Sequence, residues 1–291
     1  MIRALRALRA LPLLLLPLAA CADDDTTPLA DVTVMSDHAV FGDAAISPDG
    51  SVGFFAGRDG DTAVVARLAA DGTPTDLVRG APLLSARGLV AIDASSVYVA
   101  DETGDAIYEV GAGAPRIVDG TSGTHPRAVE LDAAGTLYWV GQDGGAPAVF
   151  SLAGGSRHVV AKDARFTALG GIDVAGDGTV YVTDDGGSVF EVSGAIVSVL
   201  AAGVTLGDPA GIALTGDDRT VLVSSLDATG HSQVLLLDAS TGSRSTFDDV
   251  IGANTGSGGL HRAQDATDRF IWCGSTVGNG GPGTVFRVDL R

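Results

Sequence analysis

Lysine occurs once in the 291 residues, at Lys162, and glutamine occurs three times, whereas glycine occurs 41 times. Lys and Gln are good helix formers at exposed positions, so their scarcity disfavours a helical surface. Abundant Gly together with many Val, Leu and Thr indicates short strands joined by tight turns. The length could hold two average domains, but all-β folds often use as many residues in one unit.

Basic residues are also scarce. Eighteen Lys and Arg stand against 36 Asp and Glu, which gives a formal net charge of -18. Three of these Arg residues lie in the first ten positions, so 15 basic residues and a charge of about -21 remain without them. This charge excludes nucleic acid as a partner and repels anionic lipid headgroups.

The apolar run at the N-terminus is too short to span a bilayer. It reads LPLLLLPLAA at residues 11–20 and is interrupted by Pro12 and Pro17, whereas a membrane-spanning helix needs about 20 apolar residues. Because three Arg residues precede it and small residues end it, residues 1–20 are predicted to be a secretion signal.

Cysteine occurs only at Cys21 and Cys273. The segment LAAC at residues 18–21 resembles the lipobox of bacterial lipoproteins; the alternative is an ordinary cleaved signal. The resemblance implies that Cys21 carries the lipid and begins the mature chain, with residues 21–30 as an acidic tether and the acyl chains as a membrane anchor. Ala22 then favours the outer membrane of a Gram-negative envelope. No intrachain disulfide is compatible with this, and Cys273 is predicted to be a buried, inert thiol.

Six similar segments recur along the rest of the chain. Their first residues are Ala45, Gly88, Ala128, Gly171, Gly211 and Gly259, which are 43, 40, 43, 40 and 48 residues apart. Each has an apolar stretch, a turn such as DASS or GDG, and a β-rich stretch. This period is typical of propeller blades with four short strands each.

The last unit ends after its third strand, near Leu290. Residues 31–36, DVTVMS, precede the first unit and have a β-rich pattern. We therefore expect this segment to supply the fourth strand of the last blade and close the ring, which removes a free sheet edge.

The units resemble NHL repeats, most clearly in GLVAIDASSVYVADETGDAIYEV at residues 88–110. They also resemble the gluconolactonase-like, senescence-marker and TolB-like propellers. The resemblance covers residues 40–291 and implies an all-β, six-bladed β-propeller over residues 31–291. It is a poor guide to activity, because one fold carries many functions.

Metal-dependent lactonases of that family hold their ion with Glu, Asn and Asp just before the Gly of the innermost strand. The matching residues here are Ala44, Arg87, Arg127, Gly170, Ala210 and Gly258. A hard divalent cation needs several oxygen ligands. The sequence therefore predicts no metal, no cofactor and no catalytic residue at these positions.

Arg87 and Arg127 occupy equivalent places in neighbouring units. Their guanidinium groups are candidates for binding a carboxylate or phosphate at the channel mouth; the alternative is that both pair with local acids. A second candidate layer lies two positions after each unit start and includes Ser47, Glu130, Asp173 and His261. These side chains either bind a ligand or do acid–base chemistry, or simply line a solvated channel.

Two functions compete on this basis. The first is a lipid-anchored binding or scaffolding module of the cell envelope, which contacts a protein, a glycan or a small anionic ligand. The alternative is a lactonase-like hydrolase whose site has moved to the layer of Glu130, Asp173 and His261. A purely mechanical or assembly role is a third possibility.

Overall fold

The computed structural model describes residues 30–246, 256–266, 268–275 and 282–291. Within these ranges the chain forms strands and turns and contains no helix, so the described part has no helix that is long and apolar enough to cross a membrane. The proposed signal, Cys21 and nearly all of the proposed tether lie outside the described residues.

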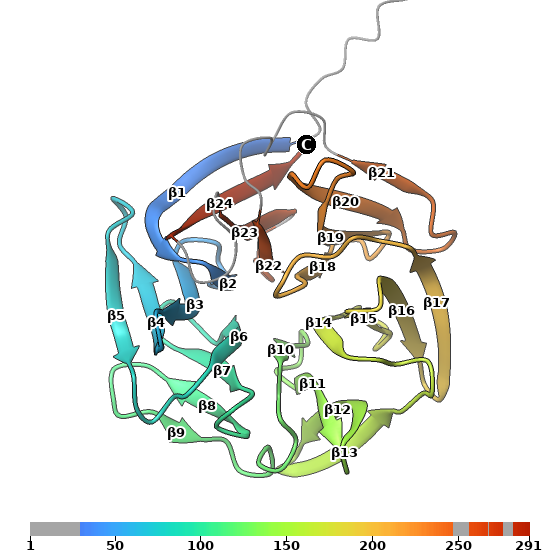
Figure 1. Ribbon diagram of the computed structural model, residues 1–291, viewed down its shortest axis with the longest axis horizontal. Helices are drawn as coiled ribbons and strands as arrows, with labels where there is room; N and C mark the ends of the chain where they lie inside the picture. Colours follow the sequence, from blue (N-terminus) through green and yellow to red (C-terminus); the bar gives the residue numbers. More distant parts are fainter. Residues whose placement is uncertain (1–29, 247–255, 267, 276–281) are drawn as a thin grey trace, which may run out of the picture.

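Six antiparallel sheets of four strands are arranged in a ring about a central axis, as Figure 1 shows. In five blades the strands follow the order of the sequence from the channel outward, and the sixth blade has the order β22-β23-β24-β1. The strands, blade by blade, are β2 (Gly42–Ile46), β3 (Gly53–Asp59), β4 (Thr62–Leu68) and β5 (Pro74–Arg79); β6 (Ala86–Ala91), β7 (Val97–Asp101), β8 (Ala106–Val110) and β9 (Arg116–Ile117); β10 (Ala128–Leu131), β11 (Leu137–Asp143), β12 (Ala146–Ala153) and β13 (Ser156–Ala161); β14 (Leu169–Val174), β15 (Val180–Asp184), β16 (Ser188–Ser193) and β17 (Ile196–Ala202); β18 (Ile212–Leu214), β19 (Thr220–Leu226), β20 (Ser232–Asp238) and β21 (Arg244–Thr246); and β22 (Gly256–Arg262), β23 (Arg269–Ser275), β24 (Pro282–Leu290) and β1 (Ala30–Val40).

The repeated Asp and Gly residues lie in the turn between the first two strands of a blade, and each has a structural reason to be there. Gly178, between β14 and β15, has a φ of 87°, a left-handed conformation that a side chain would strain. Asp177 in the same turn accepts a hydrogen bond from the Thr179 amide at 2.8 Å. Such Asp side chains stabilise turns by pairing with the backbone two residues ahead.

Aromatic side chains pack in the interior of the blades. Trp139 stacks on Phe150 with ring centroids 5.1 Å apart, and its Nε1 donates to Thr124 Oγ1 at 3.1 Å. Both rings are buried, so this blade gains apolar burial without an unpaired indole donor. Cys273 is buried too, and burial raises the pKa of its thiol to about 12.

The predicted closure of the ring is confirmed. β1 pairs antiparallel with β24, with Ala30 opposite Leu290 and Val40 opposite Pro282. The pairing is longer than the six residues expected, and two register shifts let β1 follow the curved edge of the blade. The last blade thus combines strands from both ends of the described chain.

Candidate functional site

The inner strands of the six blades line a channel that is nearly closed at its middle. The space there is only about 10 Å³, room for about one water. Small residues narrow it, because Gly88, Ala128, Gly171, Gly211 and Gly259 let the inner strands approach one another. The channel therefore consists of two separate mouths, one on each face of the ring.

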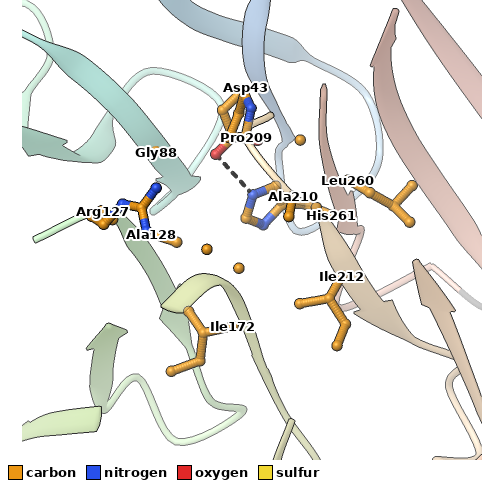
Figure 2. A pocket seen from close by; sticks show the side chains of 14 residues that line it. Asp43, Gly88, Arg127, Ala128, Ile172, Pro209, Ala210, Ile212, Leu260 and His261 are labelled. Carbon is orange, nitrogen blue, oxygen red and sulfur yellow. Dashed lines mark hydrogen bonds and ion pairs between the residues drawn. The ribbon is translucent and has the colours of Figure 1, made fainter. Parts of the chain in front are cut away.

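Three buried side chains, linked in a row by hydrogen bonds, cross the middle of the channel. Figure 2 shows two of them, Asp43 and His261, pointing toward each other. His261 Nδ1 lies 2.8 Å from Glu130 Oε2, and His261 Nε2 lies 3.2 Å from Asp43 Oδ2. All three residues are less than a tenth exposed. Because these three residues belong to β22, β10 and β2, their hydrogen bonds connect three different blades.

The contacts of His261 with these two side chains favour its charged form. Burial disfavours the imidazolium, but the charges and hydrogen bonds of Asp43 and Glu130 outweigh it, so the pKa of His261 is raised well above its usual value. Both ring nitrogens of an imidazolium are donors, which matches two carboxylate acceptors.

Asp43 is the residue that the sequence analysis missed. Counted back from the β2–β3 turn, Asp43 occupies the place of the unit-starting Gly or Ala in the other blades, so the first unit begins at Asp43 and not at Ala45. Its side chain accepts hydrogen bonds from the amides of Ala44 and Leu89, both at 2.9 Å. A Cβ at Gly259 would lie 1.3 Å from Asp43 Oδ1, so the Asp depends on that Gly.

The same shift corrects the position of Ser47. The residue of blade 1 that is equivalent to Glu130, Asp173 and His261 is Ala45. Ser47 lies in the β2–β3 turn, where its hydroxyl donates to Asp49 at 2.6 Å and accepts from the Val52 amide at 2.9 Å. Ser47 therefore stabilises a turn and does not join the polar layer.

The mouth on the side of the first hairpin turns holds an open cavity of about 220 Å³, which we call the hairpin-side cavity. Its polar side chains come from four blades: Glu130, Asp173, Asp218, Arg262 and Gln264. The cavity thus brings together Glu130 and Asp173, as the sequence predicted, with His261 directly behind Glu130.

In this cavity Asp173 has a pKa that is displaced from its usual value. Its Oδ1 accepts from the Val174 amide at 2.6 Å and its Oδ2 from the Leu214 amide at 2.5 Å. These bonds and the charge of Arg262 favour the carboxylate, but burial and the charge of Glu130 outweigh them and raise the pKa of Asp173 to about 7. Asp173 therefore exchanges its proton near neutral pH.

The opposite mouth, where loops lead into the inner strands, holds the two arginines predicted to converge. Arg87 Nη2 lies 2.9 Å from Asp208, and Arg127 Nη2 lies 2.9 Å from Asp185. The Nε atom of each arginine lies 3.5 Å from the Glu102 carboxylate. The two guanidinium groups do approach one another, but through a shared acid, and three carboxylates surround them.

The metal positions of lactonase-like propellers do not supply a ligand set here. With the corrected register the six residues are Gly42, Arg87, Arg127, Gly170, Ala210 and Gly258. Across the described ranges no group of three or more His, Cys, Asp or Glu side chains is placed to hold a metal ion. Two cationic side chains among four small residues do not fit a divalent cation.

Comparison with solved structures identifies the class of protein. A gluconolactonase from Xanthomonas campestris matches with a TM-score of 0.66 and 16% identity, covering 91% of each chain. A calcium-binding protein, regucalcin, from Agrobacterium tumefaciens matches with a TM-score of 0.65 and 14% identity, over 88% of this chain and 92% of that one.

Propellers with other roles match as well. TolB from Acinetobacter baumannii has a TM-score of 0.57 and 14% identity, over 72% of this chain and 54% of that one. No protein-family model and no curated protein sequence matches the chain. The chain is therefore a six-bladed β-propeller with the architecture of the gluconolactonase-like group, and at these identities the likeness shows the fold.

Proposed function

We propose that this chain is a lipid-anchored binding propeller of the bacterial cell envelope, and that it binds a small polar ligand in the hairpin-side cavity. The observation that carries the proposal is Asp173, a carboxyl group whose pKa lies near neutrality inside an open cavity. Ionising it costs folding free energy, and strongly perturbed groups in clefts are candidates for function.

The size and charge of the cavity limit the ligand. A volume of about 220 Å³ is below the roughly 300–1,000 Å³ of drug-sized pockets. Glu130, Asp173 and Asp218 outnumber Arg262, so an anion is disfavoured. The ligand that fits is a small molecule with hydroxyl or carbonyl groups and no negative charge.

A thermal-shift screen of the whole chain tests this. We expect neutral polar molecules to raise the melting temperature of the wild type and of Asp177→Asn, but not of Asp173→Asn. Asp177 lies on the same hairpin, outside the cavity lining, so its variant is the same Asp-to-Asn exchange without a change in the cavity. An equal shift in both variants would remove the cavity as the binding site.

The anchor is tested separately. Fractionation of cells expressing the full chain and Cys21→Ala should show the wild type in the outer membrane and the variant in the soluble fraction. Membrane attachment of both forms would overturn the lipid anchor.

Arg87 and Arg127, at the opposite mouth of the channel, support a separate hypothesis, the binding of a small anion. A carboxylate or phosphate there must displace Glu102, Asp185 or Asp208 from its arginine. Replacing both Arg87 and Arg127 with Ala should abolish the affinity for any anion that the same screen finds; unchanged affinity would end this hypothesis.

A hydrolase with a displaced site is the second candidate. It is favoured because the fold brings His261, Glu130 and Asp173 to one end of the channel. A panel of lactones with and without EDTA tests a lactonase-like activity; turnover that survives EDTA and is lost in Asp173→Asn would support this candidate.

A further inference from the structure

Two carboxyl groups enter the hairpin-side cavity from neighbouring blades but have different surroundings. Glu130 and Asp173 occupy equivalent places on β10 and β14, opposite Tyr138 and Tyr181. Glu130 accepts from His261 Nδ1 and from the Leu131 amide, both at 2.8 Å. Asp173 instead accepts from two backbone amides, as described above.

The different surroundings of the two carboxyl groups indicate that Asp173 is the one that carries a proton. His261 lies between Glu130 and Asp43, and because its pKa is raised well above the usual value its imidazolium donates a hydrogen bond to Glu130. The charged groups that face Asp173 are Glu130 from β10, Arg262 at the end of β22, and Asp218 from the β18–β19 turn. Burial and Glu130 prevail over Arg262, so Asp173 retains its proton up to about pH 7. Neighbouring carboxyl groups in unlike surroundings take the roles of acid and base.

We propose that the hairpin-side cavity is a catalytic site that hydrolyses a glycosidic or related acetal bond of an uncharged substrate, with Asp173 as general acid and Glu130 as general base. This inference rests on the proposed function, in which the cavity holds a small polar ligand. The described residues lining the cavity include no Ser, Thr, Cys, Tyr or Lys side chain, and both oxygens of Glu130 already accept hydrogen bonds from His261 and the Leu131 amide, so the proposed step uses water as the nucleophile. An acetal loses an alkoxide, which needs a proton as it departs.

The step is balanced with these two groups. A water oxygen forms a bond to the acetal carbon while the bond from that carbon to the departing oxygen breaks. Glu130 takes one proton from the water, and Asp173 gives its proton to the departing oxygen. The cavity opens to solvent, so Glu130 loses its new proton to water and Asp173 regains one, which restores the starting state.

Paired glycosides of different leaving group test the assignment. Methyl and 4-nitrophenyl β-D-glucosides, galactosides, xylosides and N-acetylglucosaminides are incubated with the full chain between pH 4 and 9. We expect turnover that falls above about pH 7, where Asp173 loses its proton. Asp173→Asn should slow the methyl glycoside about 10²–10⁴-fold, and the nitrophenyl glycoside much less, because nitrophenolate departs without a proton.

Asp177→Asn is the matched control and should retain the wild-type rate and pH profile. Glu130→Gln breaks the contact with His261 and endangers folding, so the test relies on Asp173→Asn. Absence of turnover for every glycoside, or an equal loss for both leaving groups, would overturn the inference. If the free sugars still raise the melting temperature, only the catalysis fails; if they do not and the wider screen finds no other ligand, the proposed function fails with it.

Discussion

Replacing Asp173 with Asn should change how the stability of the protein depends on pH. In the folded protein burial and the charge of Glu130 raise the pKa of Asp173 to about 7, from an ordinary value of 3.8. Between these two values the folded state holds a proton that the unfolded state has lost. By linkage, the free energy of unfolding contributed by this group falls as the pH rises from about 4 to 7.

The magnitude follows from the shift. A difference of about three units corresponds to roughly 4 kcal/mol at 1.36 kcal/mol per unit. Asp173 is partly exposed to the water of the cavity, and solvent screening reduces this to about 2 kcal/mol. Asn keeps one acceptor, so it loses one of the two backbone hydrogen bonds at a cost of about 0.5–1.5 kcal/mol. That cost does not depend on pH.

Urea unfolding of the wild type and of Asp173→Asn at pH 4.5, 6, 7 and 8 separates the two effects. We expect the stability of the variant relative to the wild type to rise by about 2 kcal/mol across this range. The titration of His261, whose contribution is full below about pH 6.5 and is lost as the pH rises through its raised folded pKa, is common to both proteins. A difference that is constant with pH would refute the reasoning about Asp173.

Three further predictions concern the frame of the channel. His261→Gln should lower the free energy of unfolding by about 3–5 kcal/mol in urea titrations, because it leaves two buried carboxylates without their cation; a loss below 1 kcal/mol would contradict this. Gly259→Ala should destabilise strongly, since the new Cβ meets Asp43, whereas Gly113→Ala meets no atom within 4 Å and should not. Deleting residues 31–36 should sharply lower the melting temperature, because β24 loses its outer partner; an unchanged value would count against the closure.

The blade count and the ring closure were predictable because they depend on local patterns. Hairpin turns such as GDG recur at a regular spacing, and the last unit visibly lacks a strand. Side chains alternate with a period of two along a strand, so the channel-facing positions of Glu130 and Asp173 followed from the repeat itself. His261 followed in the same way, although its contacts with Glu130 and Asp43 did not.

The position of Asp43 set the limit of that reasoning. The other five units start with Gly or Ala, and alignment on a small first residue passed over Asp43 and took Ala45, two positions later. Such a slip keeps the side chain on the same face and changes only its depth, so it placed Ala45 at the position of Asp43 and Ser47 at the position of Ala45.

The loop-side mouth shows another limit. Arg87 and Arg127 were placed together correctly, since equivalent positions in adjacent blades lie side by side. Their acids come from elsewhere: Glu102 follows β7, Asp185 follows β15, and Asp208 precedes β18. No local pattern in the sequence relates these segments, because only the closed ring brings them together.

The pairing of β1 with β24 also determines when the ring can form. Arg291 and Asp31 form an ion pair although 260 positions separate them. During synthesis β1 emerges long before β24, and it must wait as an unpaired edge until β24 has been made. Contacts between such distant residues form slowly, and exposed edges attract other chains meanwhile. Newly made molecules should thus be most prone to aggregation before β24 emerges, and a chain that stops before β24 should remain an open arc.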